Sequence, residues 1–169
     1  QLYGMDGGKT YENIENNPML GWRGIARSIE DKTLLQIEFE ALRRVVDSGY
    51  NNVGVFPPMT RFLTEFKQWK SIAHDIGLKR IDFGIMVETP SVALTFEEFV
   101  DDIEFMIFGS NDLTQFTLAI DRGNPKLQSK YDEKEPAVQR LMERVIRICN
   151  DYDIESSIGG EAAADSKLI

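Results

Sequence analysis

Helical segments alternate with short apolar segments along most of this chain, and that alternation constrains the fold more than any other feature. Apolar residues recur at three- and four-residue spacing over residues 33–49 and again over residues 63–77, which predicts two helices that each end at a glycine. A short apolar run follows each helix, at residues 52–56 and 81–88, and predicts a buried strand. The chain therefore contains a series of helix–strand units.

The alternation continues in the second half of the chain. A helical pattern over residues 91–100 precedes an apolar strand at residues 105–108, and a helix beginning at Pro136 precedes a strand at residues 156–158. Units of this kind predict parallel strands, because a helical crossover must return the chain between them. The sequence thus predicts an α/β fold in one domain, after a loop over the first twenty or so residues. The pattern alone leaves open a barrel or a doubly wound sheet.

Composition excludes several classes of protein. The 169 residues carry a net charge of −9 without a cluster of Lys and Arg, which argues against nucleic-acid binding. The single cysteine, Cys149, lies on an apolar helix stripe and is expected to be a core residue, and no apolar run approaches the length of a membrane span. The polar start of the chain lacks a signal-peptide pattern. We therefore expect a cytoplasmic protein with neither membrane nor nucleic-acid partners.

Polar or glycine-rich clusters follow the predicted strands. In chain order these clusters are PPMTR, ETPS, GSNDLTQ and GGEAAAD. In barrels and in open parallel sheets, ligands gather at the carboxyl ends of the strands. The sequence therefore predicts a binding site where these clusters meet.

Two carboxylates in these clusters are candidate metal ligands. Glu88 ends one predicted strand and Asp112 follows the next, so both side chains can converge at one sheet edge. Oxygen ligands of this kind suit Mg²⁺, which keeps further positions for water and substrate. The alternative is structural: Glu88 would cap a helix beginning at Pro90, and Asp112 would form an Asx turn.

The anion-binding candidates are equally open to two interpretations. Arg23, between Gly21 and Gly24, and Arg61 can bind a phosphate or carboxylate, or can be solvated loop arginines. The run Gly109-Ser110-Asn111-Asp112 can supply hydrogen-bond donors to an enolate oxygen, or can be a turn. The one histidine, His74, lies in a predicted helix without a nearby nucleophile and is expected to serve packing or the surface.

Five segments in order resemble the PEP-binding domain of the PEP-utilising enzyme family, which includes phosphoenolpyruvate (PEP) synthase, pyruvate phosphate dikinase and enzyme I of the sugar phosphotransferase system. They are ENNPMLGWRGIARSI, NNVGVFPPMTR, GIMVETPSVAL, FGSNDLTQFTLAIDRGN and IGGEAAAD. The contexts GWRG and PPMTR resemble the PEP synthases most. The contexts GWRG and GSNDLTQ disfavour other Mg²⁺-dependent enolate lyases.

The resemblance implies a (β/α)₈ TIM barrel, of which residues 1–169 would form an incomplete domain with about strands 3 to 7. It assigns Mg²⁺ to Glu88 and Asp112. It assigns phosphate and carboxylate binding to Arg23 and Arg61, with Arg23 also catalytic. Pyruvate or its enolate would lie against Gly109, Ser110, Asn111 and Asp112, with Asn111 catalytic.

The implied reaction converts pyruvate, ATP and water to PEP, AMP and phosphate, as in gluconeogenesis, through a phosphohistidine on another domain. The phosphohistidine and ATP-binding domains are expected outside this chain, which alone should be inactive. The family's proton-donating cysteine corresponds here to Gly159, which has no side chain to exchange a proton. The alternative is an impaired or truncated homologue that binds ligand or mediates assembly. In either case uncovered strand edges predict self-association, such as a homodimer.

Overall fold

Four parallel strands lie side by side in the order in which they occur along the chain. The computed structural model describes residues 15–164 and residue 166, so the first fourteen residues of the predicted N-terminal loop lie outside the described residues. The strands are β1 (Gly54–Val55), β2 (Asp82–Val87), β3 (Phe105–Gly109) and β4 (Glu155–Gly159), in the order β1-β2-β3-β4. Every neighbouring pair is parallel. The predicted α/β class with a parallel sheet is confirmed.

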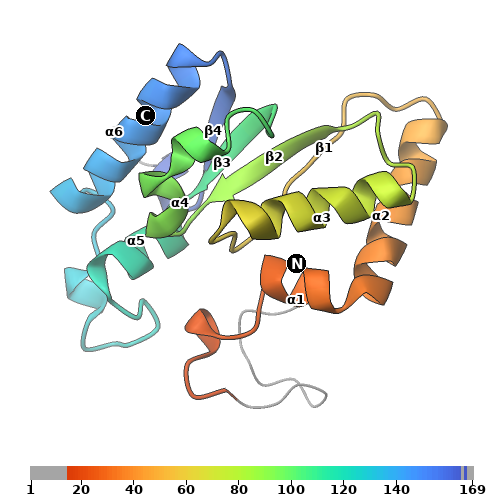
Figure 1. The fold of residues 1–169 in the computed structure, drawn as a ribbon. Coiled ribbons are helices and arrows are strands. Elements are labelled where there is room, and N and C mark those ends of the chain that lie inside the picture. Colours follow the sequence, from red (N-terminus) through yellow and green to blue (C-terminus); the bar gives the residue numbers. More distant parts are fainter. Residues whose placement is uncertain (1–14, 165, 167–169) are drawn as a thin grey trace.

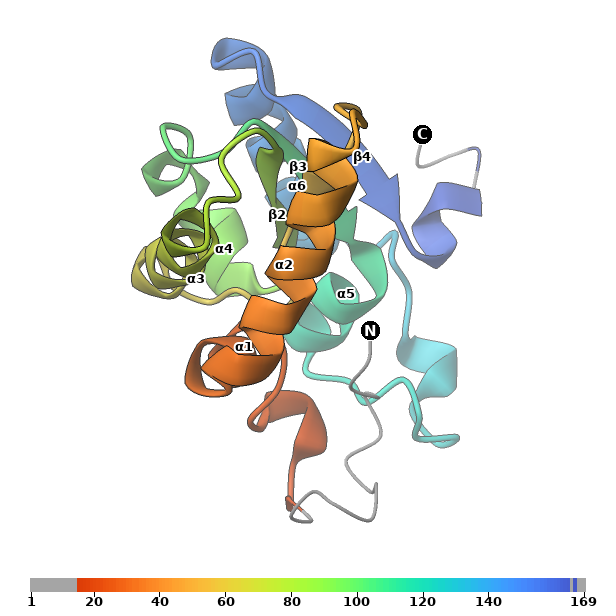
Figure 2. The same cartoon turned by 90° about the vertical axis from the view of Figure 1, so that its right-hand side faces the viewer.

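Helices connect the strands and surround the sheet (Figure 1). The α-helices are α1 (Ile25–Glu30), α2 (Lys32–Asp47), α3 (Leu63–Asp75), α4 (Pro90–Leu94), α5 (Ser110–Leu118) and α6 (Pro136–Asp151). The 3-10 helices are η1 (Pro18–Leu20), η2 (Phe96–Glu98), η3 (Gln128–Lys130) and η4 (Glu161–Ala164). Figures 1 and 2 place α1 and α2 together at one side of the molecule and α6 at the other.

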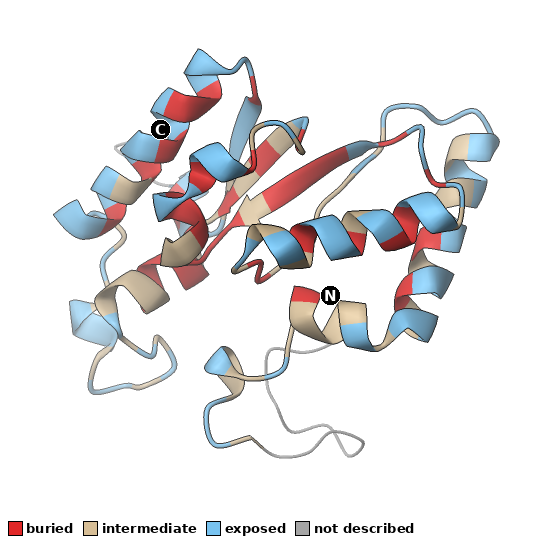
Figure 3. Cartoon of the chain, in the orientation of Figure 1, coloured by how far each residue is buried: buried red, intermediate tan, exposed pale blue. Residues whose placement is uncertain are grey.

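The core lies between the sheet and the helices α3 and α6 (Figure 3). Trp69 of α3 packs edge to face on Phe83 of β2, with ring centroids 5.9 Å apart. Cys149 is buried in α6, as predicted. His74 is exposed and contacts the edge of the Phe83 ring at 5.4 Å between centroids, which confirms its packing role. Within the described residues, none of the helices is both long and apolar enough to cross a membrane.

Local structure differs from prediction at three places. The first strand is short because Pro57 and Pro58 follow it and cannot donate to a neighbouring strand. The helix predicted over residues 91–100 is interrupted at Thr95, whose hydroxyl donates to the Ser91 carbonyl at 3.0 Å. The run at residues 109–112, for which a turn was the structural alternative, instead starts α5, because small polar and acidic residues also favour a helix N-terminus.

The described sheet is open. Strand β4 lies at its edge and exposes Glu155, Ser156 and Ser157 (Figure 3). The barrel expected from the resemblance is therefore present here only as a parallel sheet of four strands, which does not close. A closed barrel needs more strands than the four in the described part of the chain.

Candidate functional site

A cavity of about 180 Å³ lies at the carboxyl edge of the sheet, where β2, β3 and β4 end. We call it the carboxylate pocket. Its lining residues are Met86, Glu88, Phe108, Gly109, Ser110, Asn111, Asp112, Arg122, Gly159 and Gly160. Residues of three of the four strand-end clusters, all but PPMTR, therefore line one cavity.

Glu88 follows β2 and is buried, with 3% of its surface exposed. Its Oε1 accepts a hydrogen bond from the backbone N–H of Met59, in the loop after β1. Met59 has a left-handed backbone, with φ of 56°, so this loop is bent to present its N–H to the carboxylate. The helix-capping alternative for Glu88 is wrong, because Thr89 is the N-cap of α4 and no side chain caps that helix.

The surroundings of Glu88 disfavour its charged form. Burial raises the pKa of the Glu88 carboxyl from 4.5 to about 7, against the lowering effect of the Met59 hydrogen bond. The neighbouring Asp112 carboxyl raises this pKa further, while Arg23 lowers it. Two acidic groups so close together favour a shared cation or a bound proton.

Asp112 lies in the first turn of α5 between two arginines. Its Oδ2 is 3.6 Å from Nη2 of Arg23 and its Oδ1 is 3.5 Å from Nη2 of Arg122. Its side chain is 6% exposed and that of Arg23 is 13% exposed. Both structural alternatives are therefore wrong: Asp112 is helical rather than an Asx turn, and Arg23 is not a solvated loop residue.

Arg122 is a site residue that the sequence interpretation missed. It follows α5 in the segment DRGN, where a lone arginine among turn residues gives little signal. Its backbone N–H donates to the side-chain oxygen of Gln115 at 3.1 Å, which holds the loop against α5. This local contact directs the guanidinium toward Asp112.

Ser110 and Asn111 are held by groups from other segments. The Asn111 Oδ1 accepts from the backbone N–H of Glu161 at 3.0 Å, and its backbone carbonyl accepts from the Tyr131 hydroxyl at 2.9 Å. The Ser110 hydroxyl donates to Glu133 at 2.9 Å. Because the Asn111 oxygen is already used, its amide NH₂ is the group that can donate to a ligand.

Two glycines complete the far side of the pocket. Gly160 has φ of 104°, and a Cβ there would lie 2.3 Å from the Ser110 Oγ, so a side chain is not tolerated. Gly159 is different, because a Cβ there would meet its nearest atoms at 3.5 Å, an ordinary contact distance. The structure therefore requires glycine at position 160 but not at position 159.

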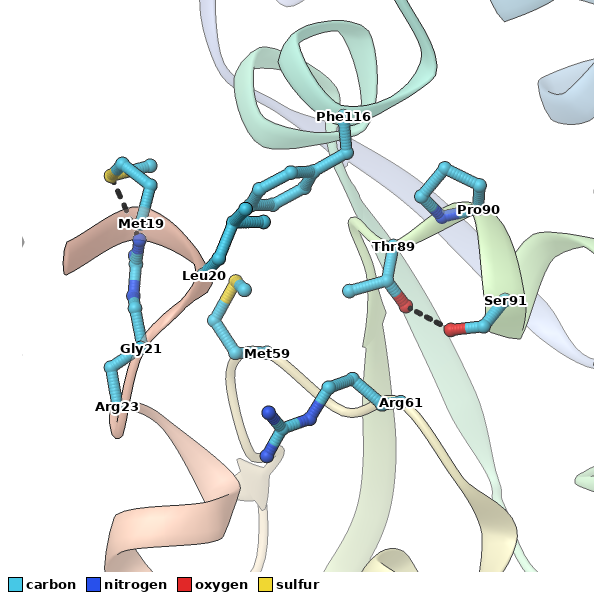
Figure 4. Close-up of a pocket in the computed structure, with 10 residues that line it drawn as sticks. All are labelled: Met19, Leu20, Gly21, Arg23, Met59, Arg61, Thr89, Pro90, Ser91 and Phe116. Atoms are coloured by element: carbon cyan, nitrogen blue, oxygen red, sulfur yellow. Dashed lines mark hydrogen bonds between the residues drawn. The ribbon is translucent and has the colours of Figure 1, made fainter. Parts of the chain in front are cut away.

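Arg61 lies in an adjacent cavity of about 360 Å³ and is not brought to the carboxylates. In Figure 4, Met19, Leu20 and Arg23 line one side of this cavity and Thr89, Pro90 and Ser91 line the other. Arg61 pairs with Glu65, with its Nη2 2.9 Å from Oε1. Arg23 lines this cavity and also reaches Asp112, so it lies between the two cavities.

Glu88 and Asp112 fit a site for a hard divalent cation. The Asp112 Oδ1 is buried and has no hydrogen-bond partner among the described residues. The described residues contain no group of three or more His, Cys, Asp or Glu able to hold a metal, so the protein would supply two carboxylates. Two carboxylates suit Mg²⁺, which keeps water and ligand oxygens in its remaining positions. Chemically, the pocket can hold a small anion between a cation, two arginines and an amide donor.

Comparison with known proteins identifies a family for this chain. Residues 3–169 match the family described as PEP-utilising enzyme, PEP-binding domain. The chain is 45% identical to the phosphoenolpyruvate synthase of Pyrococcus furiosus in an alignment of 168 positions that covers 97% of this chain and 20% of that protein. It is 32% identical to a phosphoenolpyruvate-protein phosphotransferase of Buchnera aphidicola in an alignment of 169 positions that covers 93% of this chain and 29% of that protein. The chain thus spans about a fifth of its synthase relative.

Proposed function

Since this chain belongs to the family of PEP-binding domains of PEP-utilising enzymes, we propose that it forms the PEP- and pyruvate-binding part of a PEP synthase-like phosphotransferase. The complete reaction would convert pyruvate, ATP and water to PEP, AMP and phosphate. A phosphohistidine on a separate domain would carry the phosphoryl group, and a further domain would bind ATP. The observation that carries the proposal is the pair Glu88 and Asp112, buried between two arginines at the strand ends.

Glu88 and Asp112 would hold Mg²⁺ through their carboxylates. When bound, Mg²⁺ would neutralise charge on the ligand's oxygens and favour the enolate form of pyruvate. The Asp112 Oδ1 supports this assignment: it is 3.5 Å from the Arg122 guanidinium but accepts no hydrogen bond, and a buried carboxylate oxygen without a hydrogen bond is costly. The raised pKa of Glu88 supports it as well, since a cation would replace the bound proton.

The remaining pocket residues would bind and orient the substrate. The guanidinium groups of Arg23 and Arg122 would bind its phosphate or carboxylate. The Asn111 amide would donate to the enolate oxygen from a fixed position, because Tyr131 and the Glu161 N–H hold that residue on two sides. Arg61, in the adjacent cavity, would act only on a ligand large enough to reach both cavities.

A partial TIM barrel is the architecture that we propose for the whole domain. Sequential order of parallel strands, without the reversal that marks a doubly wound sheet, supports this interpretation. The exposed edge strand β4 would pair with further strands or with another chain. We therefore propose that the chain self-associates, which light scattering on the purified chain would measure.

The alternative is a ligand-binding or assembly module without catalysis. Gly159 favours it, because the position that carries the family's proton donor has no side chain here. Such a module would bind pyruvate but would exchange the protons of its methyl group slowly.

Calorimetric titration of the chain with oxalate, a stable analogue of the pyruvate enolate, tests the proposal with and without Mg²⁺. We expect binding only with Mg²⁺, and at least a tenfold loss of affinity in Asp112→Ala because a cation ligand is removed. Asp151→Ala, at the exposed end of α6, is the matched control and should bind as the unmodified chain does. Equal affinity of Asp112→Ala and the unmodified chain would show that the metal assignment is wrong.

A further inference from the structure

Two glycines stand side by side at the carboxyl edge of the sheet. Gly109 of β3 and Gly159 of β4 are paired in register, and both line the carboxylate pocket. The absence of a side chain at each leaves a notch between the strands. Glu88 occupies only one of these two notches.

The notch at Gly109 is occupied by Glu88. A Cβ at Gly109 would lie 2.7 Å from Oε2 and 2.8 Å from Cβ of Glu88, so this glycine is needed to let the carboxylate lie against the sheet. Its role is therefore explained by the packing of the site itself.

The notch at Gly159 has room for a methyl group, which would make ordinary van der Waals contacts there. A Cβ there would be 3.5 Å from Cδ1 and 3.9 Å from Cγ1 of Ile107, and its φ is outside the left-handed region. Neither the backbone nor the neighbours demand a glycine, so the missing side chain leaves usable space. We call this space the Gly159 recess.

The recess is bordered by the Ile107 side chain and by the backbone carbonyl oxygen of Phe108, which is 3.5 Å from the Cβ position. Side chains alternate between the faces of a strand, so Ile107 shares the face of Gly109, and Met86 shares the face of Glu88. The Met86 sulfur lies 3.2 Å from the position that a Cβ at Gly109 would take, next to the notch at Gly109. Charged and amide groups thus lie at the edge of the sheet, and hydrocarbon lies deeper between the strands.

A ligand that matches this polarity has an anionic head and a short alkyl tail. We propose that the carboxylate pocket accepts 2-oxo acids with an additional alkyl group on carbon 3, of which 2-oxobutanoate is the smallest, and that the Gly159 recess holds that group. The carboxylate lies toward Arg23 and Arg122, and the keto oxygen toward Asn111. The inference rests on the proposed function, because it uses the same anion-binding residues.

The test compares the dissociation constants of pyruvate and 2-oxobutanoate, measured by calorimetry on the whole chain with Mg²⁺. Burial of one CH₂ contributes about 0.8 kcal/mol, so 2-oxobutanoate should bind roughly fourfold more tightly than pyruvate. In Gly159→Val the branched side chain fills the recess, and the ratio of the two constants should reverse. Gly159→Ala, which adds one methyl group, should give an intermediate ratio.

Ser156→Val is the matched control, because residue 156 is exposed on the opposite face of β4 and should leave the ratio as it is in the unmodified chain. Oxalate has no carbon 3, so its Mg²⁺-dependent binding reports on the proposed function alone and on the folding of each variant. The recess proposal is wrong, and the proposed function stands, if oxalate binds but pyruvate binds more tightly than 2-oxobutanoate. The same conclusion follows if the ratio of the two dissociation constants is the same in Gly159→Val as in the unmodified chain. If neither oxalate nor either 2-oxo acid binds, both are wrong.

Discussion

Replacement of Glu88 by glutamine tests whether the buried charge of this carboxylate destabilises the folded chain when no cation is bound. Burial, more than any other cause, raises the pKa of Glu88 from 4.5 to about 7 in the folded chain. The folded state without metal therefore holds the proton more tightly than the unfolded state does. The bound proton therefore stabilises the folded state fully below pH 4.5, and this stabilisation is lost as the pH rises through about 7.

The magnitude follows from the two pKa values. A pKa of about 7 instead of 4.5 corresponds to a free-energy difference on the order of 3 kcal/mol for a group that is 3% exposed. Glutamine carries no charge and keeps an oxygen for the Met59 N–H. Without metal at pH 8, Glu88→Gln should therefore be more stable than the unmodified chain by up to about 3 kcal/mol. Near pH 4.5 the two should be similar.

Urea denaturation at several pH values in the presence of a chelator measures this difference. Added Mg²⁺ should stabilise the unmodified chain at pH 8 but not Glu88→Gln, because the variant lacks one carboxylate. Glu143→Gln, at an exposed position of α6, is the control and should show no such pH dependence. The reasoning is refuted if Glu88→Gln is less stable than the unmodified chain at pH 8, or if the difference between them does not change with pH.

Three further substitutions test other parts of the site. Arg122→Gln should weaken PEP binding in calorimetry by tenfold or more, since a charged hydrogen bond contributes about 1.5–3 kcal/mol, and Arg147→Gln at an exposed site should not weaken it. Gly160→Ala should cost about 1–3 kcal/mol in urea denaturation because of its positive φ and its close approach to Ser110, whereas Gly159→Ala should cost less. Gly159→Cys should accelerate deuterium exchange of the pyruvate methyl group, followed by NMR with Mg²⁺, by about a hundredfold if a thiol can supply the missing acid–base group. An unchanged rate would refute that role for the position.

Much of this molecule follows from local features of its sequence. Helical periodicity and short apolar runs predicted α2, α3, α6 and the strands, because these patterns depend on neighbouring residues alone. Polar clusters after successive parallel strands placed Glu88, Asn111 and Asp112 in one pocket, since the carboxyl ends of such strands share an edge. Five ordered motifs also predicted the family.

Only the tertiary structure decided how the charges pair and how strongly they are desolvated. Arg122 reaches Asp112 from a later loop, Met59 donates to Glu88 across 29 positions, and Arg61 turns instead to Glu65. The difference between the two notches likewise depends on the register of β3 and β4. Residue types and spacing determine which groups reach an edge. Distances, burial and pKa depend on segments far apart in the sequence, and these are set when the chain packs.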